Sequence, residues 1–167
     1  MSEQNEIIEQ TGTQEGTGTQ EGTGTAQAET TATSAINEVV EAVIADINTR
    51  TYFATVTRGA LPTGGGLTCE VGPTSFSAMH MDKRLVVPLD LTLNGKSSSL
   101  REVSEAMNGI HAYLGFKTTY PADTSSADRW QIIDITTMTM PQVIGREQNG
   151  DWLMASALSV KFYWRGE

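Results

Sequence analysis

The segment Met140–Arg165, MPQVIGREQNGDWLMASALSVKFYWR, decides the fold. Asn149-Gly150 favours a two-residue type I′ turn, because both residues readily adopt positive φ angles, and extended segments flank it on both sides. The even positions from Trp152 are mostly apolar: Trp152, Met154, Ser156, Leu158, Val160, Phe162 and Trp164. The odd positions include Ser159, Lys161 and Arg165. This period of two predicts a β-hairpin whose second strand has one face in the core.

Two amphipathic helices are predicted upstream. The first begins at a cap formed by Thr33 or Ser34, and its apolar positions recur three and four residues apart: Ile36, Val39, Val40, Val43, Ile44 and Ile47. The second begins at a capping box, Ser99-Leu100-Arg101-Glu102, and ends at Gly115, which is expected to be a left-handed C-cap. Its predicted buried stripe is Leu100, Val103, Met107, Ile110 and Leu114.

Four more extended segments complete the predicted sheet: residues 51–57, 67–71, 85–93 and 130–140. Each proline lacks an amide hydrogen, so it is tolerated only where the strand ladder needs no donor. Pro88 therefore predicts an edge strand or a bulge, and Pro141 predicts the first residue of a strand or an edge.

The resulting order is helix, three strands, helix and three strands. We expect an α+β fold of two layers, with both helices on one face of a mixed or mostly antiparallel sheet. The other face is apolar for a monomer, which predicts burial against further copies of the chain. The outward residues behind this expectation are Val86, Tyr52 or Phe53, Val143 or Ile144, and Tyr163.

The first 33 residues differ in composition from residues 34–167. They contain six glutamates and no lysine or arginine, and residues 11–25 repeat the motif TGTQEG. A repeat without apolar side chains buries too little surface to offset the entropy of ordering it. The sequence thus predicts a disordered acidic tail at residues 1–33 and a single domain at residues 34–167.

Candidate catalytic and ligand-binding groups are few. Cys69, a histidine (His80 or His111) and a carboxylate (Asp82 or Asp134) are the types needed for a thiol–imidazole–carboxylate set. Cys69 is expected to face the core, however, and His111 has no partner nearby in the sequence. Gly64-Gly65-Gly66 fits neither glycine-rich nucleotide-binding motif, because no Lys-Ser/Thr follows it and it leads into a strand rather than a helix. His80-Met81-Asp82 supplies at most two metal ligands. We therefore expect no enzymatic activity, no cofactor and no metal site.

Charge and cysteine content narrow the class of protein further. The net charge is −9, without a lysine and arginine cluster, which argues against binding to a phosphate backbone. The single cysteine cannot form an internal disulfide, and a reducing cytosol is the simplest compartment. We expect no membrane segment and no export signal.

Three segments resemble a known family. Gly145–Leu153 (GREQNGDWL), closing on Val160–Trp164 (VKFYW), resembles the C-terminal signature of tail terminator or minor capsid proteins of long-tailed, siphovirus-type bacteriophages. Gly64–Glu70 (GGGLTCE) and Trp130–Ile135 (WQIIDI), with Pro141 following, also match that family's pattern. The resemblance covers about residues 50–165 and lies in the order and spacing of the three segments.

This resemblance implies a small α+β virion protein that forms a homo-hexameric ring on the head-proximal end of the tail tube. The ring would end polymerisation of the tube and join it to the neck. The implied partners are copies of the chain itself, the tail tube protein and a neck or head-completion protein. DNA would pass through the channel without sequence-specific binding, and assembly would take place in the host cytoplasm.

Two alternatives remain open, a neck or head-completion (minor capsid) protein and a cytosolic adaptor or carrier domain. Among the residues, we expect the ring interface to include Pro88, Tyr163, Gly64, Gly65 and Gly66.

Overall fold

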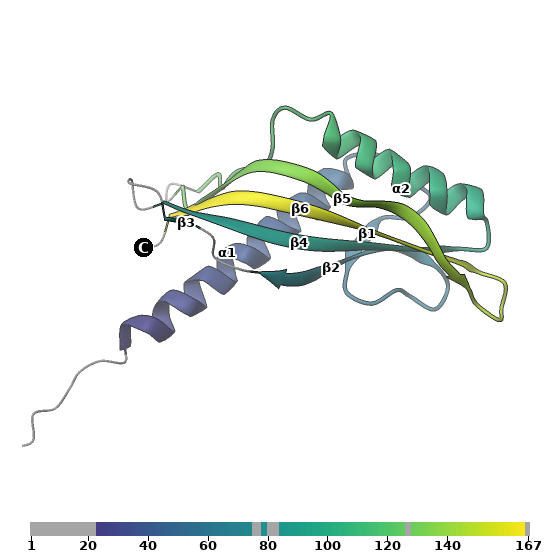
Figure 1. Cartoon of the computed structure of the whole chain (residues 1–167), viewed down its shortest axis with the longest axis horizontal. Helices are drawn as coiled ribbons and strands as arrows, with labels where there is room; N and C mark the ends of the chain where they lie inside the picture. The colour runs from purple at the N-terminus through teal and green to yellow at the C-terminus, as the bar shows by residue number, and fades with distance from the viewer. Residues whose placement is uncertain (1–22, 75–77, 80–83, 126–127, 166–167) are drawn as a thin grey trace, which may run out of the picture.

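The computed structural model describes residues 23–74, 78–79, 84–125 and 128–165 and has the predicted α+β fold. The elements in chain order are α1 (Thr23–Ile47), β1 (Val56–Arg58), β2 (Gly66–Thr74), β3 (Ala78–Met79), β4 (Arg84–Ser97), α2 (Leu100–Gly115), β5 (Trp130–Arg146) and β6 (Trp152–Arg165). One mixed sheet has the order β1-β2-β4-β6-β5, with β3 beside β4 (Figure 1). Only the β1–β2 pair is parallel among these strands.

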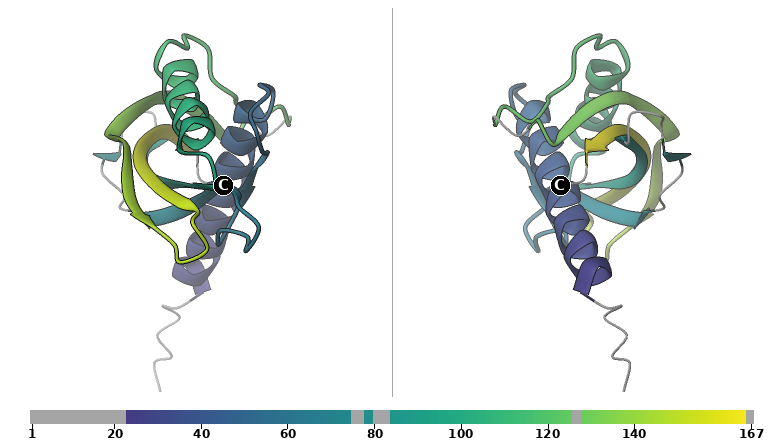
Figure 2. Two further views of the ribbon diagram at one scale, coloured as in Figure 1. Left: turned by 90° about the vertical axis from the view of Figure 1, so that its right-hand side faces the viewer. Right: turned by 90° about the vertical axis from the view of Figure 1, so that its left-hand side faces the viewer.

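Both helices cover the same face of this sheet, as predicted. Seen end-on, the sheet curves around them, and its opposite face is not covered by a helix (Figure 2). A single core of buried side chains fills the space between the two layers. Its largest fully buried members include Ile47, Leu89, Leu91, Met107, Ile110, Leu158 and Phe162.

The central strands follow the predicted alternation closely. In β6 the even residues from Met154 to Trp164 are buried, and in β4 the odd residues from Val87 to Leu93 are buried. Leu89 lies directly opposite Val160, so these two sets of side chains share the face that the helices cover. The period-two pattern is therefore confirmed in both strands.

Helix α1 begins at Thr23, so the cap expected at Thr33 or Ser34 is wrong. Residues 23–33, TGTAQAETTAT, precede the expected first turn and contain several alanines. Alanine is the strongest helix former, and α1 includes all of these residues. The expected disordered tail is not confirmed: residues 23–33 lie in α1, and residues 1–22 lie outside the described part of the chain. The predicted apolar stripe holds from Val39 to Ile47.

The C-terminal hairpin is confirmed, but its turn is not type I′. Asn149 does not have a positive φ angle, whereas Gly150 has φ +95°. The amide of Gly150 donates to the carbonyl of Glu147 (2.9 Å), and the amide of Glu147 donates to the carbonyl of Asp151 (2.8 Å). This is a three-residue loop ending in a left-handed glycine, and the Asn149 side chain stabilises it by accepting from the amide of Asp151 (3.0 Å).

The opening arm of the hairpin and the preceding extended segment are one strand. β5 runs for 17 residues and lies at the edge of the sheet, where Pro141 is tolerated. The order is therefore helix, four strands, helix and two strands rather than the predicted one. Four irregularities in the β5–β6 register allow so long a strand to follow the curved sheet.

Pro88 lies in β4, which is central, so the expected edge is wrong, although the β2–β4 register has an irregularity close by, opposite Leu89–Leu91. On one side Pro88 is opposite Lys161 of β6. On the other side, among the described residues, β2 ends opposite Leu89 and β3 begins opposite Val86. The proline thus lies at the junction between two partner strands, which also accommodates a missing donor.

The first predicted strand and the ends of α2 also need correction. β1 starts at Val56, and residues 51–55 form no strand. One half of the capping box is present: the Ser99 hydroxyl accepts from the amide of Glu102 (3.3 Å). The Glu102 carboxylate instead accepts from Ser97 Oγ (3.0 Å), and the same Ser97 Oγ accepts from the amide of Ser99 (3.1 Å). Gly115 remains helical, and the C-cap is Phe116 with φ −98°. Leu100, at the first position of α2, is 36% exposed.

Gly95 sets how closely α2 approaches the sheet. A Cβ atom at this position would lie 2.6 Å from Val103 Cγ2 and 2.9 Å from Met107 Sδ. Both contacts are buried side chains of α2, so the helix would have to move outward.

We predict that Gly95→Ala lowers the free energy of unfolding by about 1–3 kcal/mol, because a methyl group overpacks this contact. Gly115→Ala is the matched control, since a Cβ there meets no atom within 4 Å. The control should be neutral or up to about 1 kcal/mol more stable, since alanine is the better helix former. Denaturant unfolding of both variants measures the difference, and equal stabilities would contradict this account of the α2–sheet contact.

Candidate assembly surface

The residues expected at an interface separate into two groups. Pro88 and Tyr163 are near neighbours on the face opposite the helices, because Pro88 pairs with Lys161 and Tyr163 with Val86. Gly66 pairs with Lys96, eight positions further along β4. At about 3.3 Å per residue, the glycines lie roughly 26 Å from Pro88. The five residues therefore do not form one site, and Pro88 and Tyr163 are only partly exposed.

Two of the three glycines, Gly65 and Gly66, turn toward their own chain more than toward solvent. Gly65 has φ +89°, and a Cβ there would lie 2.9 Å from the carbonyl oxygen of Lys96. Gly66 has φ +152° and is buried, whereas Gly64 is exposed with open space around it. Backbone conformation thus accounts for Gly65 and Gly66. Gly64 alone remains available to a partner.

Lys96 fixes this glycine loop to the tip of the hairpin. Its side chain is only 5% exposed, and its Nζ donates to the carbonyl of Thr63 (3.0 Å). The same Nζ lies 2.8 Å from a Glu147 carboxylate oxygen and 3.8 Å from Asp151 Oδ2. Sequence reasoning missed this contact, because its partners lie 33 and more residues away in the chain.

Cys69 is fully buried, as expected. Burial raises the pKa of its thiol to about 12, so the thiolate is essentially absent at neutral pH. His80 and Asp82 lie outside the described residues. Asp134 accepts a hydrogen bond from Thr136 Oγ1 (2.8 Å).

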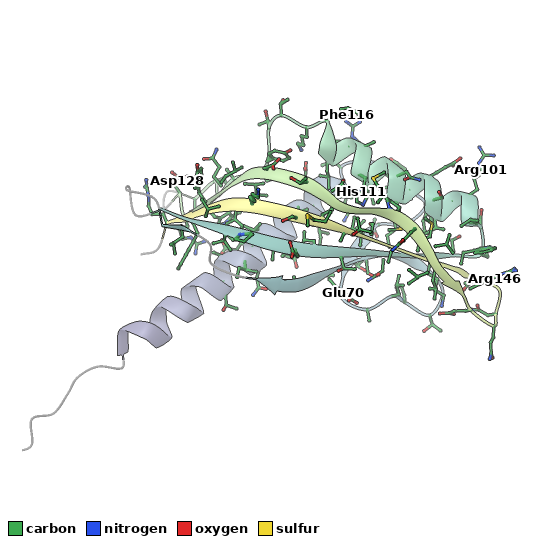
Figure 3. All side chains as sticks on the ribbon, viewed as in Figure 1. Glu70, Arg101, His111, Phe116, Asp128 and Arg146 are labelled. Atoms are coloured by element: carbon green, nitrogen blue, oxygen red, sulfur yellow. The ribbon has the colours of Figure 1, made fainter. Side chains whose placement is uncertain are left out.

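His111 is a buried polar link between α2 and the sheet, and its partners lie 26 and 45 residues away in the chain, so none is near it in the sequence. Its Nδ1 lies 2.8 Å from Thr137 Oγ1 on β5, and its Nε2 lies 2.8 Å from Ser156 Oγ on β6. A neutral imidazole satisfies both contacts, because one ring nitrogen donates and the other accepts. Burial lowers the pKa of His111 below its usual value. Figure 3 shows His111 on the side of α2 that faces the sheet.

Large apolar side chains are exposed along the outer half of the edge strand. Every residue from Thr136 to Arg146 is at least partly exposed. Most of the exposed large apolar side chains of the described residues lie on β5, and four lie in this half: Met138 (64% exposed), Met140 (62%), Val143 (47%) and Ile144 (58%). We call these four residues the β5 ridge. Exposed apolar patches of this kind mark interaction sites in soluble proteins.

A second surface feature lies beside α2. An open groove of about 690 Å³ is lined by Arg50, Tyr52, Gly109, Ala112, Tyr113, Phe116, Lys117, Thr118 and Thr119. We call it the α2 groove. The guanidinium of Arg50 lies 4.7 Å from the centre of the Tyr113 ring, and Lys117 Nζ lies 2.6 Å from Asp46 Oδ2. Phe116, at the end of α2, is 89% exposed (Figure 3).

The described residues contain no group of three or more His, Cys, Asp or Glu side chains placed to hold a metal ion. In the same part of the chain, neither helix is long and apolar enough to cross a membrane. Comparison with models of known protein families and with curated proteins finds no match to this sequence. The two surfaces described above are therefore the main structural guide to function.

We predict that acid destabilises the fold through His111. Its pKa is lower in the folded than in the unfolded protein, so the unfolded state binds the proton more readily. The contribution of His111 is thus fully present above about pH 6.5, the unfolded value, and is lost as pH falls toward the lower folded value. Denaturant unfolding between pH 8 and pH 5 measures this loss. His111→Gln should lose this part of the pH dependence, and an unchanged pH profile in that variant would contradict the assignment.

We predict that Lys96→Met lowers the free energy of unfolding by about 1–3 kcal/mol, because Thr63, Glu147 and Asp151 lose a charged partner. The loop that contains Thr63 and the three glycines should also open more often. Limited trypsin digestion detects this opening as faster cleavage after Arg58. Lys161→Met is the control, since Lys161 is exposed on the opposite face from the helices. Equal cleavage rates in the two variants would show that Lys96 does not hold the loop.

Proposed function

We propose that the protein is a virion subunit of a long-tailed phage that assembles into a ring and caps the head-proximal end of the tail tube. The role comes from the resemblance of residues 50–165 to tail terminator proteins. The observation in the structure that supports assembly is the β5 ridge, an apolar surface on an edge strand.

The β5 ridge is suited to a contact between subunits for two reasons. Its side chains contribute little to the core, because they are exposed in the single chain. Its segment Thr136–Gly145 also carries no charged residue, so burying it requires no desolvation of charge. Single exposed apolar residues are normal on a monomer, whereas four within seven residues of one strand favour a contact with a partner.

A ring interface needs more area than one strand supplies. Specific interfaces usually bury at least about 1,000 Å² in total, so other surfaces must contribute. Pro88 and Tyr163 lie on the uncovered face of the sheet and are partly exposed, so they remain candidates beside the β5 ridge. Gly65 and Gly66 are better explained by the conformation of their own loop.

The charge of the subunit agrees with a channel through which DNA slides. The chain carries 20 acidic against 11 basic residues. An acidic wall repels the phosphate backbone and so does not retain DNA by counterion release. A neck or head-completion protein shares this requirement, and binding to the end of a tail tube distinguishes the two functions.

We predict that Met140→Asp leaves the fold intact and abolishes the ring, because it places a charge in an apolar contact that is open in the monomer. Native mass measurement and negative-stain imaging of the purified proteins give the readout. Wild type should form six-subunit rings, and phage carrying the variant should produce tails of uncontrolled length or tails that do not join heads.

Ser98→Asp is the matched control, since Ser98 is exposed outside β5 at the start of α2. It should form rings as wild type does. Normal rings and tails with Met140→Asp would remove the β5 ridge from the interface. A wild-type protein that stays monomeric even with tube ends present would contradict the terminator function itself.

A further inference from the structure

The β5 ridge and the α2 groove lie on opposite sides of α2. His111 points from α2 toward Thr137 at the beginning of the ridge half of β5. Gly109 and Tyr113, which line the groove, are each two positions from His111. At about 100° per residue, two positions are a rotation of about 200°, so the groove opens on the far side of the helix. One subunit therefore carries two different surfaces, one along β5 and one on the far side of α2.

We propose that the β5 ridge of one subunit packs into the α2 groove of the next, head to tail around the ring. This inference rests on the proposed ring and names the two surfaces that form its interface. The partner of each surface is thus a second copy of the same chain.

The chemistry of the two surfaces is complementary. Met138 and Met140 are the most exposed members of the ridge, and the groove is lined by the rings of Tyr52, Tyr113 and Phe116. Thioethers contact aromatic rings favourably, and methionine adapts its shape to an irregular surface. The groove volume of about 690 Å³ is within the roughly 300–1,000 Å³ of sites that enclose small molecules, which is enough for several side chains.

Arg50 gives the groove a donor for a strand edge. Among the described residues its guanidinium forms no ion pair, and it lies over the Tyr113 ring. The outer edge of β5 is paired with residues 121–123 only near Trp130–Ile132 among the described residues, so its ridge half offers backbone carbonyl groups to a partner. The guanidinium can donate to such carbonyls while the apolar side chains fill the groove.

Direct pairing of two β5 strands fits the structure less well. Four register irregularities and Pro141 interrupt β5, and such features hinder continuous pairing with another strand. Pairing of β5 with β5 would also be isologous, which yields closed dimers and leaves the groove empty. A contact between two different surfaces repeats from subunit to subunit and closes into a ring when the rotation allows.

Cysteine cross-linking distinguishes these arrangements in the full-length protein. Cys69 is the only native cysteine and is buried, so it does not compete. Met140→Cys and Phe116→Cys place thiols at positions that are 62% and 89% exposed, where the fold tolerates substitution. A short bismaleimide is the cross-linker, and a denaturing gel gives the readout.

The head-to-tail arrangement predicts a different product for each sample. The double variant should form a ladder of covalent oligomers up to the full ring. An equimolar mixture of the two single variants should form covalent dimers. Each single variant alone should run as a monomer on the denaturing gel. Met140→Cys combined with Ser98→Cys is the control and should give no ladder.

Dimers formed by Met140→Cys alone would overturn the proposal in favour of β5–β5 pairing. Rings that form in native mass measurement while the double variant stays uncross-linked would show that the ring exists but uses other surfaces. A wild-type protein without rings would contradict the proposed function, and the arrangement with it.

Discussion

The pairing of β4 with β6 is the constraint on which the structure depends. All fourteen residues of each strand pair without a register irregularity, from Arg84 opposite Arg165 to Ser97 opposite Trp152. Because side chains alternate with a period of two, this register places the apolar positions of both strands on one face. The helices pack on that face, and β2 and β5 extend the sheet from β4 and β6. A shift of one residue would turn every one of these side chains toward solvent.

Sequence reasoning recovered the elements whose burial is strictly periodic. The buried positions of β4, β6, α1 and α2 recur at regular spacing, so the two-layer α+β fold followed from them. It was less accurate where local signals compete with tertiary context. Pro88 indicates an edge, but a change of partner strand at that point allows it in the centre of the sheet. Gly150 alone, and not Asn149, has the positive φ angle, because the loop contains three residues.

The surfaces proposed for assembly were only partly predictable. Val143 or Ile144 was expected to face outward, and both are exposed on β5. The α2 groove combines Arg50 and Tyr52 with α2 residues nearly sixty positions later, and no local pattern connects them. Lys96 and His111 also have partners that are distant in the chain, 26 to 51 positions away. Buried polar side chains must find hydrogen-bond partners, yet the sequence does not say which ones.

The inner half of the edge strand β5 stabilises the fold, and its outer half is free to serve assembly. From Trp130 to Ile135 its inward side chains join the core, and from Thr136 onward none of its residues is buried. The change falls where Thr137 contacts His111, so a polar link to α2 lies at the boundary between the two parts. Substitutions beyond this boundary remove few core contacts and therefore change the fold little. The outer half of β5 can thus adapt to a partner surface, while its inner half keeps the strand in register with β6.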